Sequence, residues 1–255
     1  MSLGPGGRSY MVPEAVDALR SAEIIVGYKT YLDLIPDLTQ GKKTIASGMR
    51  KEVERCRTSI DLAAAGFRVA LVSSGDAGIY GMAGLVFDIC RERELTVAGP
   101  RDMAEEAVPD FHIDVIPGVA AFTAAASLLG APLMHDFAAV SLSDHLTPWE
   151  HIVKRLDAAA SADFVLAIYN PRSKARPHLL EKAREILLRH RSPGTPVAIV
   201  RRAMREGEWK HLTTLEGLPF DEVDMQSVVI VGNSKTYAWK GWMITPRGYL
   251  DKYSV

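Results

Sequence analysis

The chain has 255 residues, of which 47% are hydrophobic and 24% are charged, and its formal net charge at pH 7 is -1. This composition is that of a globular protein with room for one large domain or two small ones. The net charge argues against nucleic-acid binding through overall charge, with a local basic groove as the alternative. Cys56 and Cys90 form no CxxC pattern, so a disulfide framework, zinc knuckle or iron–sulfur cluster is not expected. This use of cysteine fits a reducing cytoplasm best. No apolar run approaches the roughly 18 residues of a membrane span, and the N-terminus has no basic region followed by an apolar one, so neither insertion nor export is indicated.

The first feature in chain order is a glycine-rich turn without the strand that normally precedes one. Gly4-Pro5-Gly6-Gly7 begins three residues after the start of the sequence. Such a turn lets the backbone leave a buried strand and approach a ligand closely, yet Met1 to Leu3 are too few to form that strand. The position of the turn therefore needs an explanation.

In the first half, short apolar runs alternate with longer amphipathic ones, as in an α/β protein with largely parallel sheets. We expect helices over residues 14–22, 51–66 and 84–93. We expect strands over residues 23–27, 69–76 and 112–118. The last of these strands ends at Pro117-Gly118.

The second half repeats the alternation. An Ala-rich helix is expected over 119–130, an amphipathic helix over 178–191, and strands over 137–144, 164–170, 197–202 and 228–233. We place a domain boundary near Pro117, which gives an α/β domain over 1–116 and a second over 117–255; a turn within one sheet is the alternative.

Ligands bind beyond the carboxyl ends of strands in open α/β sheets, so the loops after the apolar runs are the candidate sites. The loop 73–84 places four glycines around Asp76 and Tyr80. It can bring backbone groups against a ligand, and Asp76 can accept hydrogen bonds from it, although an ordinary turn is the alternative. The chain has no HExxH, GxSxG or complete P-loop motif, which disfavours hydrolase and NTPase functions.

A basic loop follows the strand expected at 164–170. Arg172, Lys174 and Arg176 alternate along it, and in an extended segment they would share one side. This pattern indicates a carboxylate or phosphate site, with a solvated basic loop as the alternative.

Two further loops carry groups that can transfer protons. They hold Asp144 with His145, and His135 with Asp136. A pair of this kind is also common as a loop hydrogen bond. The small residues after Gly118 would let an adenosine-sized ligand approach closely, and a tightly packed core helix is the alternative.

Taken in order, seven segments resemble the tetrapyrrole methylases, the S-adenosylmethionine-dependent enzymes of cobalamin and sirohaem biosynthesis. Within that family the resemblance is to the precorrin-3B C17-methyltransferases. The segments are IVGYKTYLDLI (25–35), GMRKEVER (48–55), VSSGDAGIYGMAG (72–84), GAPLMHDFA (130–138), SLSDHLTPWE (141–150), YNPRSK (169–174) and GNSKTYAWKGWMITPRGY (232–249). They span nearly the whole chain.

The resemblance implies two α/β domains with a cofactor cleft between them, in a homodimer. The family's contacts to S-adenosylmethionine, and to the product S-adenosylhomocysteine, would fall on Pro5, Gly75, Asp76, Ile79, Ala120, Ala121, Tyr169 and Ser227. Two positions depart from the family's pattern. Gly-Asp-Pro is Gly-Asp-Ala at residues 75–77, and Ala120 stands where a hydroxyl residue is common.

The implied reaction is methyl transfer to carbon 17 of precorrin-3B, or of cobalt-factor III, with ring contraction to precorrin-4 or its cobalt form, in cobalamin (vitamin B12) biosynthesis. No protein metal is implied. The acetates and propionates of such a tetrapyrrole would be held by Arg172, Lys174, Arg176 and Arg50, because arginine binds carboxylates through paired hydrogen bonds. Asp144 and His135 are the candidates for proton transfer.

Three alternatives remain: methylation of another corrinoid intermediate, methylation of RNA, and a non-catalytic tetrapyrrole carrier. The near-neutral charge argues against RNA, and we expect neither nucleic-acid nor membrane partners. In this family the Gly-Pro-Gly turn ends the first strand of the sheet. We therefore expect that MSL replaces or shortens that strand, which would leave unpaired sheet edges next to a gap or another chain.

Overall fold

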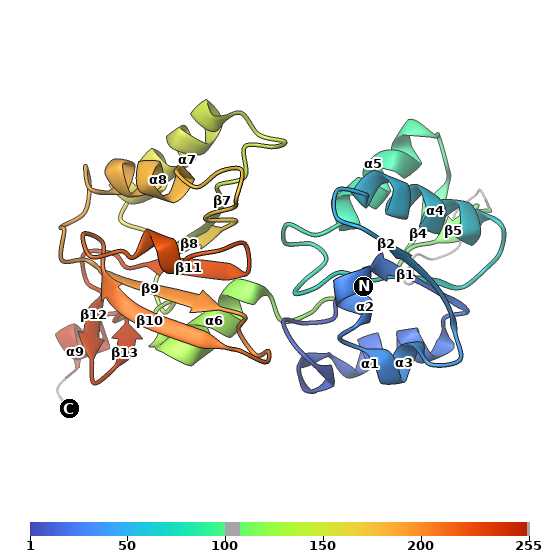
Figure 1. The fold of residues 1–255 in the computed structure, drawn as a ribbon, viewed down its shortest axis with the longest axis horizontal. Helices are drawn as coiled ribbons and strands as arrows, with labels where there is room; N and C mark the ends of the chain where they lie inside the picture. Colours follow the sequence, from blue (N-terminus) through green and yellow to red (C-terminus); the bar gives the residue numbers. More distant parts are fainter. Residues whose placement is uncertain (100–107, 254–255) are drawn as a thin grey trace. The chain divides into compact units, whose positions relative to one another are not determined.

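The computed structural model describes residues 1–99 and 108–253, which form two compact units (Figure 1). The N-terminal unit is Met1–Ala121 and the C-terminal unit is Phe122–Val255. The boundary lies five residues beyond the expected division at 116/117. The segment after Pro117 belongs to the N-terminal unit because it is tied to the glycine-rich loop, where the Gly118 N–H donates to the Asp76 carboxylate at 2.9 Å.

The N-terminal unit is built on parallel strands, as expected. One sheet has the order β2-β1-β3, and a second pairs β4 with β5. The strands are β1 (Ile24–Tyr28), β2 (Lys43–Ser47), β3 (Val69–Leu71), β4 (Val97–Ala98) and β5 (Phe111–His112). β3 and β5 are shorter than the strands expected over 69–76 and 112–118.

Helices pack on both faces of the β2-β1-β3 sheet. The helical elements of the unit are the 3-10 turn η1 (Arg8–Tyr10), α1 (Pro13–Ser21), α2 (Lys29–Leu32), α3 (Pro36–Thr39), α4 (Glu52–Ala64) and α5 (Ala83–Glu92). α1 and α3 lie on one side and α4 and α5 on the other (Figure 1). Side chains alternate along β3: Ala70 joins the core beneath α1, whereas Leu71 packs against the core between α4 and α5.

The C-terminal unit contains a five-stranded sheet of order β10-β9-β11-β8-β7. Its strands are β7 (Phe137–Ser141), β8 (Val165–Tyr169), β9 (Pro196–Arg201), β10 (Trp209–Thr214) and β11 (Ser227–Val231). Only β7 and β8 pair in parallel within this sheet; the other three pairings are antiparallel. The expectation of largely parallel sheets is therefore wrong here, because strands buried on both faces read as apolar runs whichever way they point.

α7 (Trp149–Ser161) and α8 (Leu179–Leu187) cover one face of this sheet (Figure 1). Their buried side chains form one core with β8, β9 and β11, which includes Leu156, Leu180, Leu166, Ile199 and Val229. The remaining elements of the unit are α6 (Ala121–Leu129), β6 (Gly130–Ala131), η2 (Phe220–Glu222), β12 (Tyr237–Trp239), β13 (Trp242–Ile244) and α9 (Tyr249–Lys252). Among the described residues, no helix has the length and apolar character needed to cross a bilayer.

Met1 to Gly4 form no full strand, in line with their small number. They make two isolated bridges, Ser2 with Ser73 and Gly4 with Gly75. The segment thereby takes a place beside the chain that follows β3, and it carries the glycine-rich turn to that position.

Candidate functional site

Three segments of the N-terminal unit meet at the predicted cofactor residues: 2–5, 73–76 and 117–121. Gly4 and Gly75 exchange both backbone hydrogen bonds, at 3.1 and 2.7 Å. Both residues have positive φ angles, 70° and 67°, which glycine adopts without strain. A Cβ at Gly4 would also collide with the Tyr10 carbonyl. The two predicted ligand-binding turns are therefore joined to each other by their backbones.

The carboxylate of Asp76 links the glycine-rich loop to the chain before α6. One oxygen accepts a hydrogen bond from the Gly78 N–H at 2.7 Å, and the other accepts one from the Gly118 N–H at 2.9 Å. Asp76 thus holds its own loop and the Pro117-Gly118 turn in fixed relation. This organising role was not part of the sequence-based expectation, which assigned its hydrogen bonds to a ligand.

Gly75 also lies against the residues that lead into α6. A Cβ built on Gly75 would stand 3.5 Å from the Ala121 nitrogen and 4.0 Å from the Ala120 Cα. Pro5, Gly75 and Ala120 are buried, Asp76 and Ala121 are partly exposed, and Ile79 is 37% exposed. The structure therefore brings together six predicted cofactor residues, with Asp76, Ala121 and Ile79 presenting their accessible surface.

Tyr169, at the end of β8, caps helix α6. Its hydroxyl accepts a hydrogen bond from the Phe122 N–H at 3.1 Å, and the two rings meet edge to face with centroids 6.3 Å apart. The first N–H groups of a helix have no partner within the helix, so this contact satisfies one of them. Tyr169 thereby positions the start of α6.

Ser227 is less suited to contact a ligand. It is the first residue of β11 and is 3% exposed. Its hydroxyl donates to the Asp224 carboxylate at 2.9 Å and accepts a hydrogen bond from the Asp224 N–H at 3.1 Å. The side chain is engaged within the C-terminal unit, and it offers almost no surface to a ligand.

The basic loop is a tight turn and not an extended segment. Ser173 and Arg176 exchange both backbone hydrogen bonds, at 3.3 and 3.0 Å. The expectation that Arg172, Lys174 and Arg176 share one side through alternate spacing is therefore wrong, because that spacing applies only to extended chain. Arg172 and Arg176 instead bind different partners.

Arg172 and Lys174 line a pocket in the C-terminal unit. The pocket has a volume of about 510 Å³ and is completed by Ser173, Pro177 and residues 223–226. Arg172 donates to the Phe220 carbonyl at 2.7 Å and to the Asp221 carboxylate at 2.9 Å. No carboxylate pairs with Lys174 among the described residues, so its charge remains available to an anion.

Arg176 forms an ion pair with Asp144 at 2.8 Å and donates to the Ser143 hydroxyl at 3.0 Å. The hydrogen bond from Arg176 lowers the pKa of Asp144 below its ordinary value. Asp144 is therefore a carboxylate at neutral pH. This state suits a proton acceptor or a counter-ion.

His135 and Asp144 lie at opposite ends of β7, because His135 precedes Phe137 and Asp144 follows Ser141. A five-residue strand is about 17 Å long, so the structure does not bring the two predicted catalytic residues together. The His135 ring accepts a hydrogen bond from the Asp136 N–H at 2.8 Å, a local loop contact. The structure therefore does not pair His135 with Asp144 for proton transfer.

Sequence reasoning missed two polar residues near these sites. Ser2 donates to the Ile116 carbonyl at 2.7 Å and accepts from the Ala77 N–H at 2.8 Å, so it fastens the N-terminal segment to the glycine-rich loop. Asn170 has a φ of 50° and donates to the Ser141 hydroxyl at 2.9 Å. An asparagine directly before proline at a strand end signals such a turn.

The comparisons with known proteins identify the family of the chain. The family model described as Tetrapyrrole (Corrin/Porphyrin) Methylases matches residues 1–219. The chain belongs to the tetrapyrrole methylase family. It is therefore a methyltransferase, and tetrapyrrole methylases use S-adenosylmethionine as methyl donor.

Several individual proteins are similar to this tetrapyrrole methylase over most of its length. It is 51% identical to a probable cobalt-factor III C(17)-methyltransferase of Salmonella typhimurium, over 98% of both chains. It is 45% identical to a cobalt-factor III methyltransferase of Priestia megaterium, of which it covers 45%. A crystal structure of the methyltransferase CobJ matches with a TM-score of 0.86 and 37% identity, over 96% of this chain and 97% of that one.

Proposed function

We propose that this tetrapyrrole methylase transfers a methyl group from S-adenosylmethionine to carbon 17 of precorrin-3B or cobalt-factor III, with ring contraction. The product is precorrin-4 or cobalt-precorrin-4, an intermediate of cobalamin biosynthesis. Support comes from the 51% identical Salmonella relative and from the CobJ structure, both matched over nearly their full lengths.

The cofactor is proposed to contact Pro5, Gly75, Asp76, Ile79, Ala120, Ala121 and Tyr169. The observation that carries this proposal is the convergence of residues 2–5, 73–76 and 117–121, fixed by the bonds between Gly4 and Gly75 and between Asp76 and Gly118. Glycines at close backbone approaches leave N–H and C=O groups accessible to a ligand. Ser227 is left out of the proposed set because it is 3% exposed and its hydroxyl is bonded to Asp224.

Methyl transfer from a sulfonium requires the attacking carbon, the methyl group and the sulfur in line. Correct positioning can supply up to about 7–11 kcal/mol of the barrier. The contribution of the chain is therefore to hold both molecules in place, and the hydrogen bonds of Asp76 and Tyr169 give two of its binding segments a fixed geometry.

The tetrapyrrole carboxylates are proposed to bind cationic side chains. Arg172 and Lys174 line the 510 Å³ pocket, and Arg50 is exposed on the loop between β2 and α4. Arg176 is the fourth candidate, although its ion pair with Asp144 competes with a substrate carboxylate. Asp144 is proposed to accept the proton released during ring contraction.

Purified protein incubated with S-adenosylmethionine and either metal-free precorrin-3B or cobalt-factor III tests the proposal. Absorbance and mass spectrometry should show one added methyl group and a contracted ring with one of the two substrates. Binding of the macrocycle without any methylated product would favour a non-catalytic carrier. Turnover of only a different corrinoid would assign the chain to another step.

The chain is further proposed to act as a homodimer in the cytoplasm, with the tetrapyrrole as its partner and no nucleic acid or membrane. Sedimentation equilibrium of the purified protein would give a mass twice that of one chain. A single-chain mass at micromolar concentration would contradict the dimer.

A further inference from the structure

Two arginines at the loop between β2 and α4 have unfavourable surroundings. Arg50 has a φ of 63°, in the left-handed region that favours glycine and strains residues with a side chain. Arg55, on α4, has a side chain that is only 4% exposed, and burying a charge costs free energy unless it is paired. A strained arginine and a buried arginine thus lie five positions apart. The proposed function gives Arg55 no part.

The Arg55 guanidinium joins the end of β2 to the start of α4. Its Nη1 donates to the Ser47 hydroxyl and to the Gly48 carbonyl, both at 2.8 Å. Its Nη2 donates to the Glu52 carboxylate at 3.2 Å. Ser47 is the last residue of β2, and Glu52 is the first of α4. One buried side chain therefore fixes both ends of the loop that carries Arg50.

The same guanidinium also braces the loop against β1. It lies over the Tyr28 ring, with 5.9 Å between the guanidinium carbon and the ring centroid. Tyr28 is the last residue of β1 and pairs with Ser47 of β2, and its ring meets that of Tyr31 edge to face at 5.1 Å. The brace therefore stands at the carboxyl edge of the parallel sheet, where open α/β proteins bind their ligands.

The loop presents a cation between exposed apolar side chains. Arg50 is exposed, and Met49 and Val53 beside it are 68% and 46% exposed. In the described chain no carboxylate pairs with Arg50, whereas its neighbour Lys51 pairs with Glu54 at 2.7 Å. An arginine that is free to bind an anion, flanked by apolar surface, suits a ligand with an apolar ring system and carboxylate substituents.

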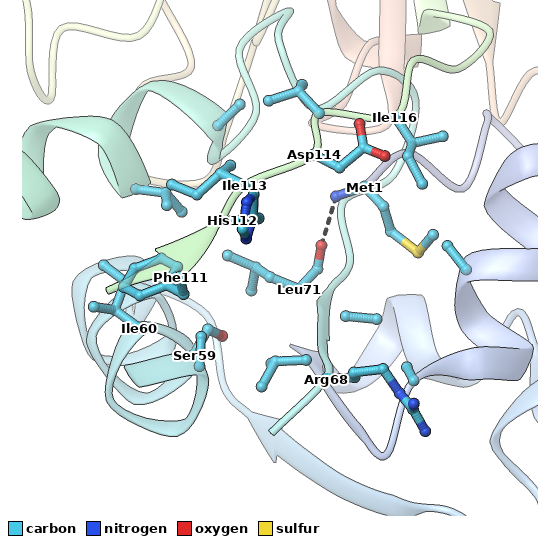
Figure 2. Close-up of a pocket in the computed structure, with 18 of the residues that line it drawn as sticks. Met1, Ser59, Ile60, Arg68, Leu71, Phe111, His112, Ile113, Asp114 and Ile116 are labelled. Atoms are coloured by element: carbon cyan, nitrogen blue, oxygen red, sulfur yellow. Dashed lines mark hydrogen bonds between the residues drawn. The ribbon is translucent and has the colours of Figure 1, made fainter. Parts of the chain in front are cut away.

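A pocket of about 600 Å³ between β3 and residues 111–116 suits such a ligand less well (Figure 2). Its walls are mostly apolar, and they carry the acidic residues Asp110 and Asp114. Arg68, on its wall, already donates to the Ser21 carbonyl at 3.0 Å. A ligand with several carboxylates would be repelled by the two acids there, which favours the loop at residues 48–51.

We propose that Arg55 is a positioning residue, which holds the loop 48–51 so that Arg50 binds one carboxylate of the tetrapyrrole. Met49 and Val53 would lie against the edge of the ring. The inference rests on the proposed function for the identity of the ligand. Fixing Arg50 before the ligand arrives reduces the entropy that is lost on binding. A glycine at position 50 would relieve the strain, but it would bring no cation.

The test is a double-mutant cycle that measures the affinity for a polycarboxylate porphyrin, uroporphyrin III, by fluorescence titration. Arg50→Ala should weaken binding about tenfold, the effect of losing one charged hydrogen bond. Arg55→Lys keeps the buried charge but loses the guanidinium fork, and should weaken binding about threefold to tenfold. Ser47→Ala, which removes one acceptor of Arg55, should act in the same direction and replaces Arg55→Lys if that variant does not fold.

In the Arg50→Ala background, Arg55→Lys should weaken porphyrin binding by less than about twofold, because Arg55 acts through Arg50. Calorimetry should give S-adenosylhomocysteine affinities within about twofold of the parent for every variant. Arg57→Ala, an exposed arginine on α4, is the matched control and should bind the porphyrin as the parent does. Arg50→Gly should bind it as weakly as Arg50→Ala but melt about 2 °C or more higher, because glycine adopts the left-handed conformation without strain.

Additive losses in the double variant would overturn the proposal, and so would an equal weakening of porphyrin and S-adenosylhomocysteine binding, because both describe a purely structural arginine. Unchanged porphyrin affinity in Arg50→Ala, or a parent protein that binds no porphyrin, would also overturn it. None of these readouts requires methyl transfer. If the two arginines are coupled but neither precorrin-3B nor cobalt-factor III is methylated, the proposed reaction fails and the positioning role stands.

Discussion

Asp76 and Gly118 are 42 residues apart in sequence, yet the Asp76 carboxylate accepts the Gly118 N–H at 2.9 Å. The same carboxylate accepts the Gly78 N–H at 2.7 Å. One side chain therefore fixes two of the three segments proposed to hold the cofactor. A hydrogen bond to a charged group contributes about 1.5–3 kcal/mol, so its loss should be measurable in binding and in stability.

Asp76→Ala should weaken S-adenosylhomocysteine binding at least tenfold and lower Tm, because both backbone donors lose their acceptor. Asp76→Asn should have a smaller effect, since its amide oxygen can still accept one of the two bonds. Isothermal titration calorimetry gives the affinities, with Asp88→Ala on the exposed face of α5 as the control. Unchanged affinity in Asp76→Ala would remove Asp76 from the proposed site.

Tyr169→Phe should destabilise the start of α6 by about 1 kcal/mol, the usual value of a lost helix cap. The ring remains, so its contact with Phe122 is kept and only the hydroxyl is tested. We expect a lower Tm and a higher KM for S-adenosylmethionine. Tyr237→Phe, an exposed tyrosine on β12, is the matched control and should change neither value.

Lys174→Ala should raise KM for the tetrapyrrole about tenfold and leave S-adenosylhomocysteine affinity unchanged. The side chain lines the 510 Å³ pocket without an ionic partner in the described chain, so its removal costs the protein little stability. Arg172→Ala should raise KM as well, but its bonds to Phe220 and Asp221 predict a lower Tm in addition. Lys43→Ala on β2 is the control.

An unaltered KM at limiting tetrapyrrole in both Lys174→Ala and Arg172→Ala would place the substrate carboxylates elsewhere. Thermal melting separates the two variants, because only Arg172 supports the chain around η2. If KM rises only in Arg172→Ala, the variant that also loses stability, and not in Lys174→Ala, then Arg172 has a purely structural role.

Arg176→Ala should raise the pKa of Asp144 toward its ordinary value of 3.8, because the hydrogen bond that lowers it is lost. As the pH falls, Asp144 should therefore become protonated at a higher pH in the variant than in the parent protein. Carbon-13 NMR of the side-chain carboxyl follows this titration directly. Arg172→Ala is the control, since its partner is Asp221; an equal Asp144 shift in both variants would contradict a specific pairing.

The sequence predicted the strands that are apolar runs, and it missed two polar strands at sheet edges. β8, β9 and β11 are continuous apolar runs, and the structure places strands at all three. β2 and β10 lie at sheet edges with mostly polar, partly exposed residues, so no apolar run marks them. The antiparallel direction of strands in the C-terminal unit was missed because these strands are buried on both faces. They therefore lack the alternation of apolar and polar residues that is typical of antiparallel strands.

The sequence also predicted only part of the candidate site. The family resemblance identified Gly75, Asp76 and Ala121, which the structure brings together. Local spacing failed at the basic loop, where the turn between Ser173 and Arg176 replaces an extended segment. Contacts such as the Tyr169 cap join residues 47 positions apart, and no local pattern encodes them.

The buried amino group of Met1 predicts that the stability of the protein depends on pH between about 6 and 8. Burial lowers the pKa of the Met1 amino group from 8.0 to about 6, although the nearby carboxylates of Asp114 and Asp76 oppose the shift. Between these values the unfolded chain binds more protons than the folded one, so stability rises with pH from about 6 to 8. A shift of two units corresponds to at most about 2.7 kcal/mol.

Chemical denaturation at pH 6, 7 and 8 should therefore give a steeper rise in the free energy of unfolding for the free amine than for an Nα-acetylated form. Acetylation removes the titrating group, while the histidines contribute equally to both forms and cancel in the difference. Intact-mass measurement confirms that Met1 is retained in each sample. Parallel curves for the two forms would show that the amino group is solvated in the folded protein, since only burial lowers its pKa and produces the extra slope.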